Sequence, residues 1–153
     1  MSLGKFIDEM KKTFMLHAIA AHFSNGLIPV AVLYLLLALP TGDAFFEHTV
    51  IHLLVIVVMA IPFSFVSGIV DWKKKYKGAK APVFEKKIRL GIALCVLALS
   101  ATSVRLFVPG VMAEQGLLHW VYVSMLLAML PVVVLLGHHG GKLTAGQKQE
   151  KFR

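Results

Sequence analysis

Residues 45–70 read FFEHTVIHLLVIVVMAIPFSFVSGIV, and Glu47 is the one Asp, Glu, Lys or Arg in this run. As an α-helix rising 1.5 Å per residue, the run is about 39 Å long, which exceeds the roughly 30 Å hydrocarbon core of a bilayer. Three further apolar stretches cover residues 16–39, 88–108 and 117–137. Because a backbone in lipid must satisfy its own hydrogen bonds, lone segments can cross only as helices. We therefore predict an all-α integral membrane protein with four transmembrane helices.

The composition agrees with a membrane protein rather than a soluble one. Of 153 residues, 58% are hydrophobic and only 16% are charged, whereas soluble domains are about half apolar and a quarter charged. The net charge of +8 is segregated into particular loops, which indicates membrane topology and not a nucleic-acid partner. A single cysteine, Cys95, excludes an internal disulfide. The length fits one domain.

Lysine and arginine predict the orientation of the helices. Three groups of cations precede the first helix, separate the second from the third, and follow the fourth: Lys5, Lys11 and Lys12; eight residues from Lys73 to Arg89; and Lys142, Lys148, Lys151 and Arg153. The other two connections carry Asp43, Glu47 and Glu114 and no cation. By the positive-inside rule both termini are cytoplasmic, and short connections favour an up-down-up-down bundle. Residues 1–15 form an amphipathic cytoplasmic lead-in, and residues 138–153 form a basic cytoplasmic tail. The first apolar stretch is too long for a secretory signal and lacks a small-residue cleavage site.

Seven histidines lie within or at the ends of three apolar segments. Ionisable groups inside a membrane are costly and indicate function, although each one alone could be an interfacial or packing residue. The predicted topology divides them between the two halves of the membrane. His17, His22, His138 and His139 fall in the cytoplasmic half, and His48, His52 and His119 fall in the outer half.

Histidines from different helices at one depth can be the two axial ligands of a haem. His52 and His119 come out at similar depth, about 10 Å from the midplane. In the cytoplasmic half, His138 can pair with His17, which depth favours, or with His22, which lies deeper in the membrane. We therefore predict two b-type haems forming a path across the membrane. Arg105 is the only cation in the outer half and could pair with a haem propionate or extend to the surface.

Two other kinds of site compete with haem. His48 and His52 are spaced i, i+4, which suits zinc, but two ligands do not complete a zinc site. A proton relay along the histidines lacks a membrane-embedded Asp or Glu to continue it. A small metal or proton transporter and a cofactor-free structural subunit with interfacial histidines therefore remain as alternatives.

Short motifs resemble a family of small bacterial four-helix membrane proteins of unknown function. The family pattern H-P-x-x-x-H-F-P is similar to residues 17–24, HAIAAHFS, and Gly68-Ile69-Val70-Asp71-Trp72 is similar to its Gly-Leu-Leu-Asp-Trp ending. Related domains, some fused to c-type cytochromes, end in G-H-x-G-G-x-L-T-H-G, and residues 137–146 read GHHGGKLTAG. The likeness extends from His17 to Gly146. Ala18, Ser24 and Ala145 depart from it, because they stand where the family has proline, proline and histidine.

The resemblance implies an electron-transfer setting in a bacterial inner (cytoplasmic) membrane, with His17, His22 and His138 as family-type positions. His52 and His119 match no motif position and rest on depth alone. We predict a b-type cytochrome subunit that exchanges electrons with quinone beside other redox subunits, surrounded by lipid. As an electron-transfer subunit, it is not predicted to act as a stand-alone enzyme.

Overall fold

The computed structural model describes residues 3–12 and 15–151, without the side chains of residues 6, 9–12, 15–18, 75 and 144–151. The described residues form helices and turns, with no strand. The helices are α1 (Leu3–Lys12), α2 (Met15–Thr41), α3 (Ala44–Lys75), α4 (Pro82–Phe107) and α5 (Leu117–Lys151), with a 3₁₀ turn, η1 (Pro109–Met112), before α5. Helices α2 to α5 are each long and apolar enough to cross a membrane. The prediction of an all-helical chain with four such helices is confirmed.

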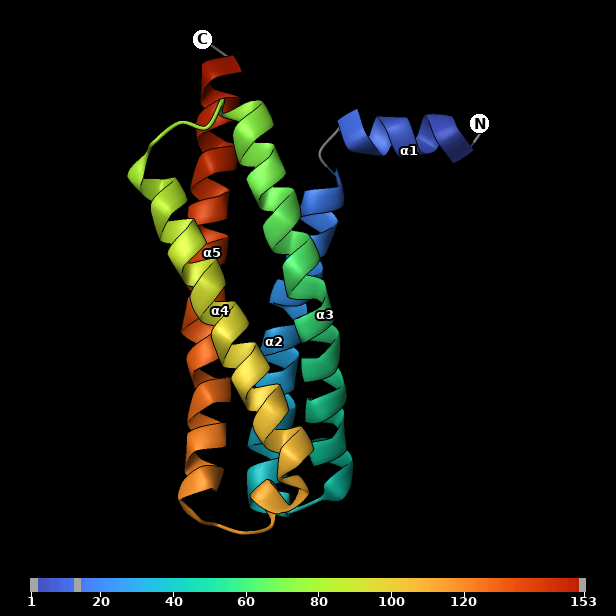
Figure 1. The fold of residues 1–153 in the computed structure, drawn as a ribbon, viewed down its shortest axis with the longest axis vertical. Helices are drawn as coiled ribbons and strands as arrows, with labels where there is room; N and C mark the ends of the chain where they lie inside the picture. The colour runs from blue at the N-terminus through green and yellow to red at the C-terminus, as the bar shows by residue number, and fades with distance from the viewer. Residues whose placement is uncertain (1–2, 13–14, 152–153) are drawn as a thin grey trace.

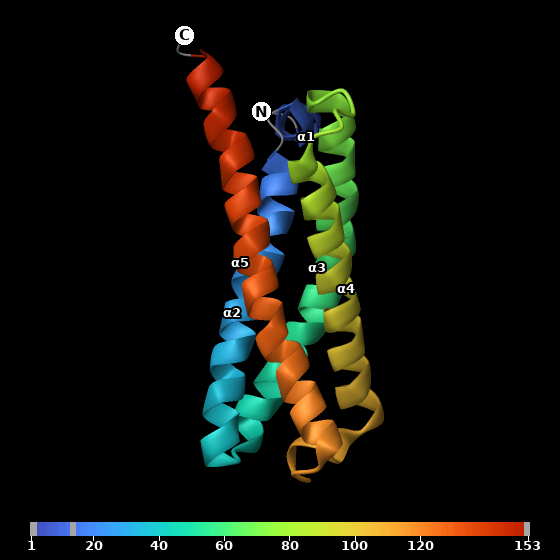
Figure 2. The same ribbon diagram turned by 90° about the vertical axis from the view of Figure 1, so that its left-hand side faces the viewer.

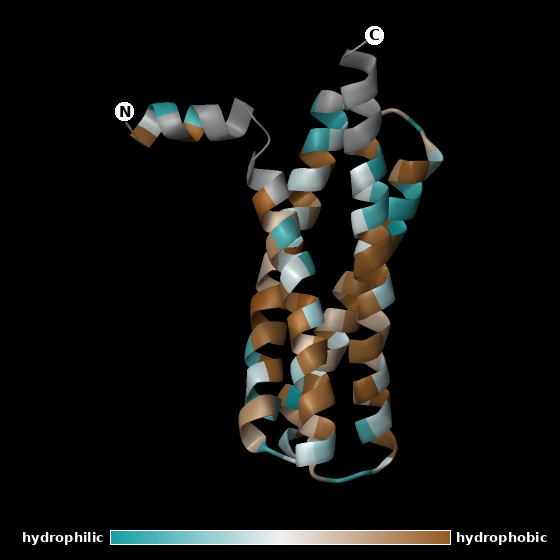
Figure 3. Ribbon diagram, turned by 180° about the vertical axis from the view of Figure 1, so that it is seen from behind, coloured by the Kyte–Doolittle hydropathy of each residue, from teal (hydrophilic) through white to brown (hydrophobic). Residues whose placement is uncertain are grey.

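The four long helices form a closed ring in which α2 contacts α3, α3 contacts α4, α4 contacts α5, and α5 returns to α2. Both chain ends and the α3–α4 connection lie at one end of the bundle (Figure 1), and the α2–α3 and α4–α5 connections lie at the other. Helix α1 runs across the long axis of the bundle at the end that carries the termini, and Figure 2 shows it nearly end-on. Hydrophobic residues dominate the length of the bundle, and hydrophilic ones gather near its ends (Figure 3).

Local sequence explains where the helices begin and end. The Asp43 carboxylate accepts a hydrogen bond of 2.8 Å from the Phe45 amide and caps α3. Helix α3 ends where Lys77 and Gly78 adopt positive φ angles of 50° and 68°, and Pro82 opens α4 in the first turn, where its missing N–H costs nothing. These signals lengthen the helices beyond the apolar runs, so that α3 extends five residues past Val70 and α4 begins six before Ile88.

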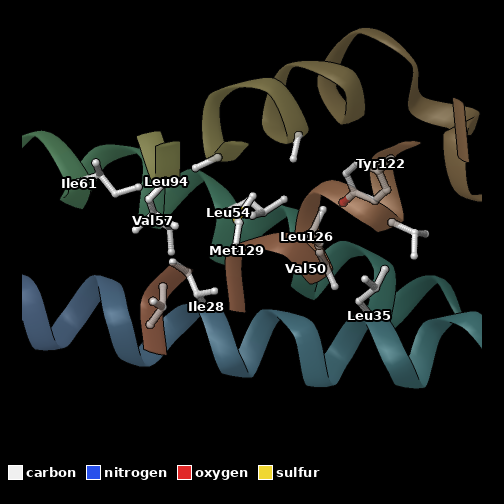
Figure 4. Packing of buried hydrophobic residues seen from close by; sticks show 14 of the residues in the cluster. Ile28, Leu35, Val50, Leu54, Val57, Ile61, Leu94, Tyr122, Leu126 and Met129 are labelled. Carbon is white, nitrogen blue, oxygen red and sulfur yellow. The ribbon is translucent and has the colours of Figure 1, made fainter. Parts of the chain in front are cut away.

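In the four long helices, fully buried side chains are confined to one half of the bundle, which we call the sealed half (residues 24–41, 44–61, 94–107 and 117–133). Ser24, Ile61, Leu94 and Val133 mark its boundary. Figure 4 shows Leu54, Leu126 and Met129 meeting at its centre. In the terminal half (residues 19–23, 62–75, 82–93 and 134–143), every described side chain is half-buried or exposed. The long helices therefore bury side chains completely at one end only.

Candidate functional site

His119 is a buried histidine that faces the centre of the sealed half. Its side chain is 3% exposed, and it lies on the same stripe of α5 as Tyr122, Leu126 and Met129. Its Nδ1 lies 3.1 Å from the carbonyl oxygen of Val111, a residue held by η1. With Nδ1–H donating to that carbonyl, Nε2 keeps its lone pair, as in many histidines that bind metals.

Arg105 forms an ion pair with Glu47 between α4 and α3. The side chains are 10% and 21% exposed, so the pair is largely withdrawn from solvent. The sequence predicted a haem propionate or the membrane surface as the surroundings of Arg105; in the structure Glu47 neutralises it. Glu47, which the sequence placed at the border between a connection and the apolar run, lies in the first turn of α3, which Asp43 caps. Sequence inspection identified no acid that could continue a proton relay; Glu47 is a candidate, since its side chain is only 21% exposed.

More polar groups surround this ion pair. Thr102 Oγ1, Arg105 Nε and Tyr122 Oη are buried and have no hydrogen-bond partner among the described residues. Tyr122 lies within electrostatic reach of both Arg105 and Glu47. Sequence inspection missed Thr102 and Tyr122, although each is spaced i, i+3 from a residue that it singled out (Arg105 and His119), a spacing that places side chains on one helix face.

The structure does not bring His52 together with His119. The buried residues of α3 are Val50, Leu54, Val57 and Ile61. At about 100° per residue, His52 lies on the opposite face from this stripe, as does His48, and both side chains are exposed. The space between α3 and α5 at this level is filled by fully buried side chains such as Leu54 and Leu126. The sealed half therefore does not fit a haem held by His52 and His119.

The other predicted ligands lie in or near the terminal half. His22, whose greater depth in the membrane counted in its favour, is exposed on α2, on the face away from Ile28 and Leu35. His17 is in the first turns of α2, and its side chain lies outside the described residues. His138 is exposed and His139 half-buried, with ring centroids 5.7 Å apart. The described side chains show no contact between His138 and a histidine of α2, but α2 and α5 are neighbours in the ring.

His138 and His139 are adjacent on α5, about 100° apart around its axis. His139 lies within electrostatic reach of Lys86 and Lys87 of α4. His138 is the more exposed of the two and lies on the side of α5 away from the buried stripe of Tyr122, Leu126 and Met129.

Small residues line the terminal half. Ala20, Ala21, Ser64, Ser67 and Gly68 are all half-buried there. Gly91 of α4 is packed so closely that a Cβ would stand 3.1 Å from the Phe65 ring of α3. Small side chains leave room for a flat group between helices or for close helix approach. Among the described glycines, Gly91 is the one beside an aromatic ring.

The zinc interpretation gains no support. Among the residues that the structure describes, no group of three or more His, Cys, Asp or Glu side chains is placed to hold a metal ion. His48 and His52 remain a pair on the outward face of α3. Cys95 is half-buried on α4 and unpaired.

Compared with known protein families, curated protein sequences and solved structures, the chain matches none of them.

Proposed function

We propose that the four long helices cross a bacterial inner membrane as an up-down-up-down bundle with both termini in the cytoplasm. The cations support this orientation, because the eight between Lys73 and Arg89 and the four in the tail belong to the terminal end of the bundle. Helix α1 lies across the bundle at the same end. An amphipathic helix in this orientation suits the boundary between membrane and water, so we place the cytoplasmic membrane surface at the level of α1.

In this membrane setting we propose a b-type cytochrome with a haem in the terminal half, bound by His138 and a histidine of α2. One observation carries this assignment: histidines of two adjoining helices, His17 and His22 of α2 and His138 of α5, lie in or next to the terminal half, where the described side chains are at most half-buried and several are small. A haem needs two axial ligands from facing helices and room for its macrocycle between them. Since His22 faces away from the buried stripe of α2, His17 is the favoured partner of His138.

The proposal differs from the two-haem path expected from depth alone. His119 keeps a free Nε2, but His52 faces away from it and packed side chains occupy the space between them. A single haem on the cytoplasmic side is therefore proposed, exchanging electrons with quinone and with other redox subunits. The motifs that resemble a bacterial family with cytochrome-linked relatives, at residues 17–24 and 137–146, also contain His17 and His138.

Haem bound at this site would supply a one-electron carrier. His138 and His17 would hold its iron through neutral imidazoles. Ser64, Ser67 and Gly68 of α3 are small and half-buried in the terminal half, and would leave room for the macrocycle.

A visible absorption spectrum of the purified full-length chain, made in a host that produces haem, tests the proposal. The dithionite-reduced protein is expected to show the α-band of a bis-histidine b-type haem. His138→Ala and His17→Ala should abolish this band, whereas His22→Ala should preserve it. A colourless protein, or a His138→Ala variant with the full band, would reject the site.

The ion pair of Glu47 and Arg105 favours a second candidate, proton movement through the bundle. The Glu47 carboxylate lies within electrostatic reach of Tyr122, which is one helical turn from His119 on α5, and it is the kind of group that the proton relay lacked in the sequence. Vesicles containing the protein and a trapped pH-sensitive dye would then show proton flux that Glu47→Gln removes. Equal flux with and without Glu47 excludes this route.

A further inference from the structure

Three lysines and two histidines from α4 and α5 meet at the terminal end of the bundle. Lys86, Lys87, Lys142 and His138 are all within electrostatic reach of His139. The Lys87 Nζ lies against α5 here, 3.9 Å from where a Cβ on Gly140 would be. We call Lys86, Lys87, His139 and Lys142 the basic cluster.

Little negative charge balances the basic cluster. Asp71 of α3 interacts electrostatically with Lys87. Glu85, the neighbouring acid on α4, is exposed and forms an ion pair with Arg89. Lys86 and Lys142 are left as exposed cations at one end of two adjoining helices. This arrangement attracts an anion.

The depth of the cluster suggests which anion. The spans Pro82–Phe107 and Leu117–Leu143 are about 39 Å long or slightly more, so each exceeds a hydrocarbon core of about 30 Å by roughly 5 Å at either end. Lys87 lies about 8 Å from the start of its span and His139 about 6 Å from the end of the other. Both are therefore near the boundary between acyl chains and headgroups, a level that a lipid phosphate occupies.

We infer that the basic cluster binds the phosphate headgroup of an anionic phospholipid between α4 and α5. The exposed Gly141 leaves the backbone of α5 accessible beside the cations, and exposed apolar side chains such as Ile92 and Leu135 on the same two helices face the acyl chains. Basic sites between transmembrane helices on the cytoplasmic side recognise such headgroups. This binding rests on the proposed membrane orientation and does not require haem, because the basic cluster contains no proposed haem ligand.

Native mass spectrometry of the full-length chain in a neutral detergent tests the inference. Phosphatidylglycerol and phosphatidylcholine with identical acyl chains are added separately, and retained lipid is counted per chain. Phosphatidylglycerol should be retained in preference, and Lys86→Gln with Lys142→Gln should weaken its binding about tenfold or more. The matched control, Lys73→Gln with Lys74→Gln, removes the same charge from exposed residues of α3 and should change binding by less than about twofold.

Each result decides the question. Equal retention of the two lipids, or equal losses in the two double variants, would overturn the inference. Inorganic phosphate that competes fully at millimolar concentration would point to a free anion and would also contradict it. A thermal melt confirms that each variant is folded, and Lys86→Arg with Lys142→Arg, which keeps both charges, should restore binding.

Discussion

At the scale of single residues, the buried ion pair between Arg105 and Glu47 is the strongest electrostatic feature of the bundle. Bringing two charges out of water is costly, and each is tolerated because the other is present. Thr102 Oγ1, Arg105 Nε and Tyr122 Oη add to the cost, since they find no hydrogen-bond partner among the described residues. The pair therefore adds little net stability. Its main effect is to fix the register between α3 and α4.

Removing one partner of this pair should be much worse than removing both. Arg105→Met leaves the Glu47 carboxylate without its partner and is expected to lower the free energy of unfolding by about 3 kcal/mol or more. Adding Glu47→Leu should recover most of that loss. Unfolding in mixed micelles measures both variants, and an Arg105→Met protein as stable as the wild type would show that the pair is not formed.

Tyr122 provides the matched control at the same depth. Tyr122→Phe removes a buried hydroxyl that has no hydrogen-bond partner in the structure while keeping the ring. Its stability should equal or exceed that of the wild type, because no bond is lost and a desolvated polar group disappears. A loss of more than about 1 kcal/mol would indicate that the hydroxyl is in fact hydrogen-bonded.

At the scale of elements, the contact between α3 and α4 in the terminal half depends on Gly91. A methyl group at this position would press on the Phe65 ring, with 3.1 Å between the carbon atoms, whereas nothing lies within 4 Å of a methyl group at Gly26 in α2. Gly26→Ala should therefore gain up to about 1 kcal/mol from helix propensity. Gly91→Ala should be less stable than Gly26→Ala by about 1 kcal/mol or more, because overpacking opposes the same gain.

Phe65→Leu tests whether contact with the Phe65 ring causes this loss, because a smaller side chain at position 65 relieves the overlap. Combined with Gly91→Ala, it should restore part of the lost stability in a thermal melt. If the two alanine variants melt alike, the close approach of Phe65 to Gly91 is absent.

The end of α3 titrates at alkaline pH. Burial, and then the charge of Asp71, raise the pKa of the Tyr76 phenol above its ordinary value of 10.0. A raised pKa in the folded state means that this group's contribution to stability is complete below the unfolded value and is lost as pH rises through the folded one. The tyrosinate absorbance that Tyr76→Phe removes should appear above pH 10.0. Its appearance at or below that pH would contradict the burial of the ring.

The existence of the four spanning helices could be predicted from sequence, whereas the direction in which their side chains face could not. Long apolar runs specify helices in lipid whatever they pack against. The run at residues 45–70 is apolar on all sides, so no stripe distinguished the face with Val50 and Leu54 from the face with His52. The prediction paired His52 with His119 by depth, and depth carries no information about rotation around the helix axis.

Contacts between helices were equally inaccessible to the sequence. The pairing of Glu47 with Arg105 joins residues far apart in the chain. The sequence therefore offered a haem propionate or the membrane surface as surroundings of Arg105, and not this carboxylate. His119 was singled out from the sequence and is buried, but its bond to Val111 depends on η1, a turn that no hydropathy pattern indicates.

At the scale of the whole molecule, the proposed topology predicts which loops face the cytoplasm. In a Cys95→Ala background, Lys77→Cys should react with a membrane-impermeant maleimide only in inside-out vesicles. Glu114→Cys should react only in right-side-out vesicles or spheroplasts. Labelling of both from one side would exclude an antiparallel bundle across the membrane.

The division of the bundle into a sealed half and a terminal half underlies the proposal of one haem on the cytoplasmic side. The most direct measurement is the ratio of haem b to protein in the purified chain, determined by the pyridine haemochrome method. We predict one haem per chain, lost in His138→Ala and retained in His52→Ala. Two haems per chain, or loss of haem in His52→Ala with none in His138→Ala, would contradict this account.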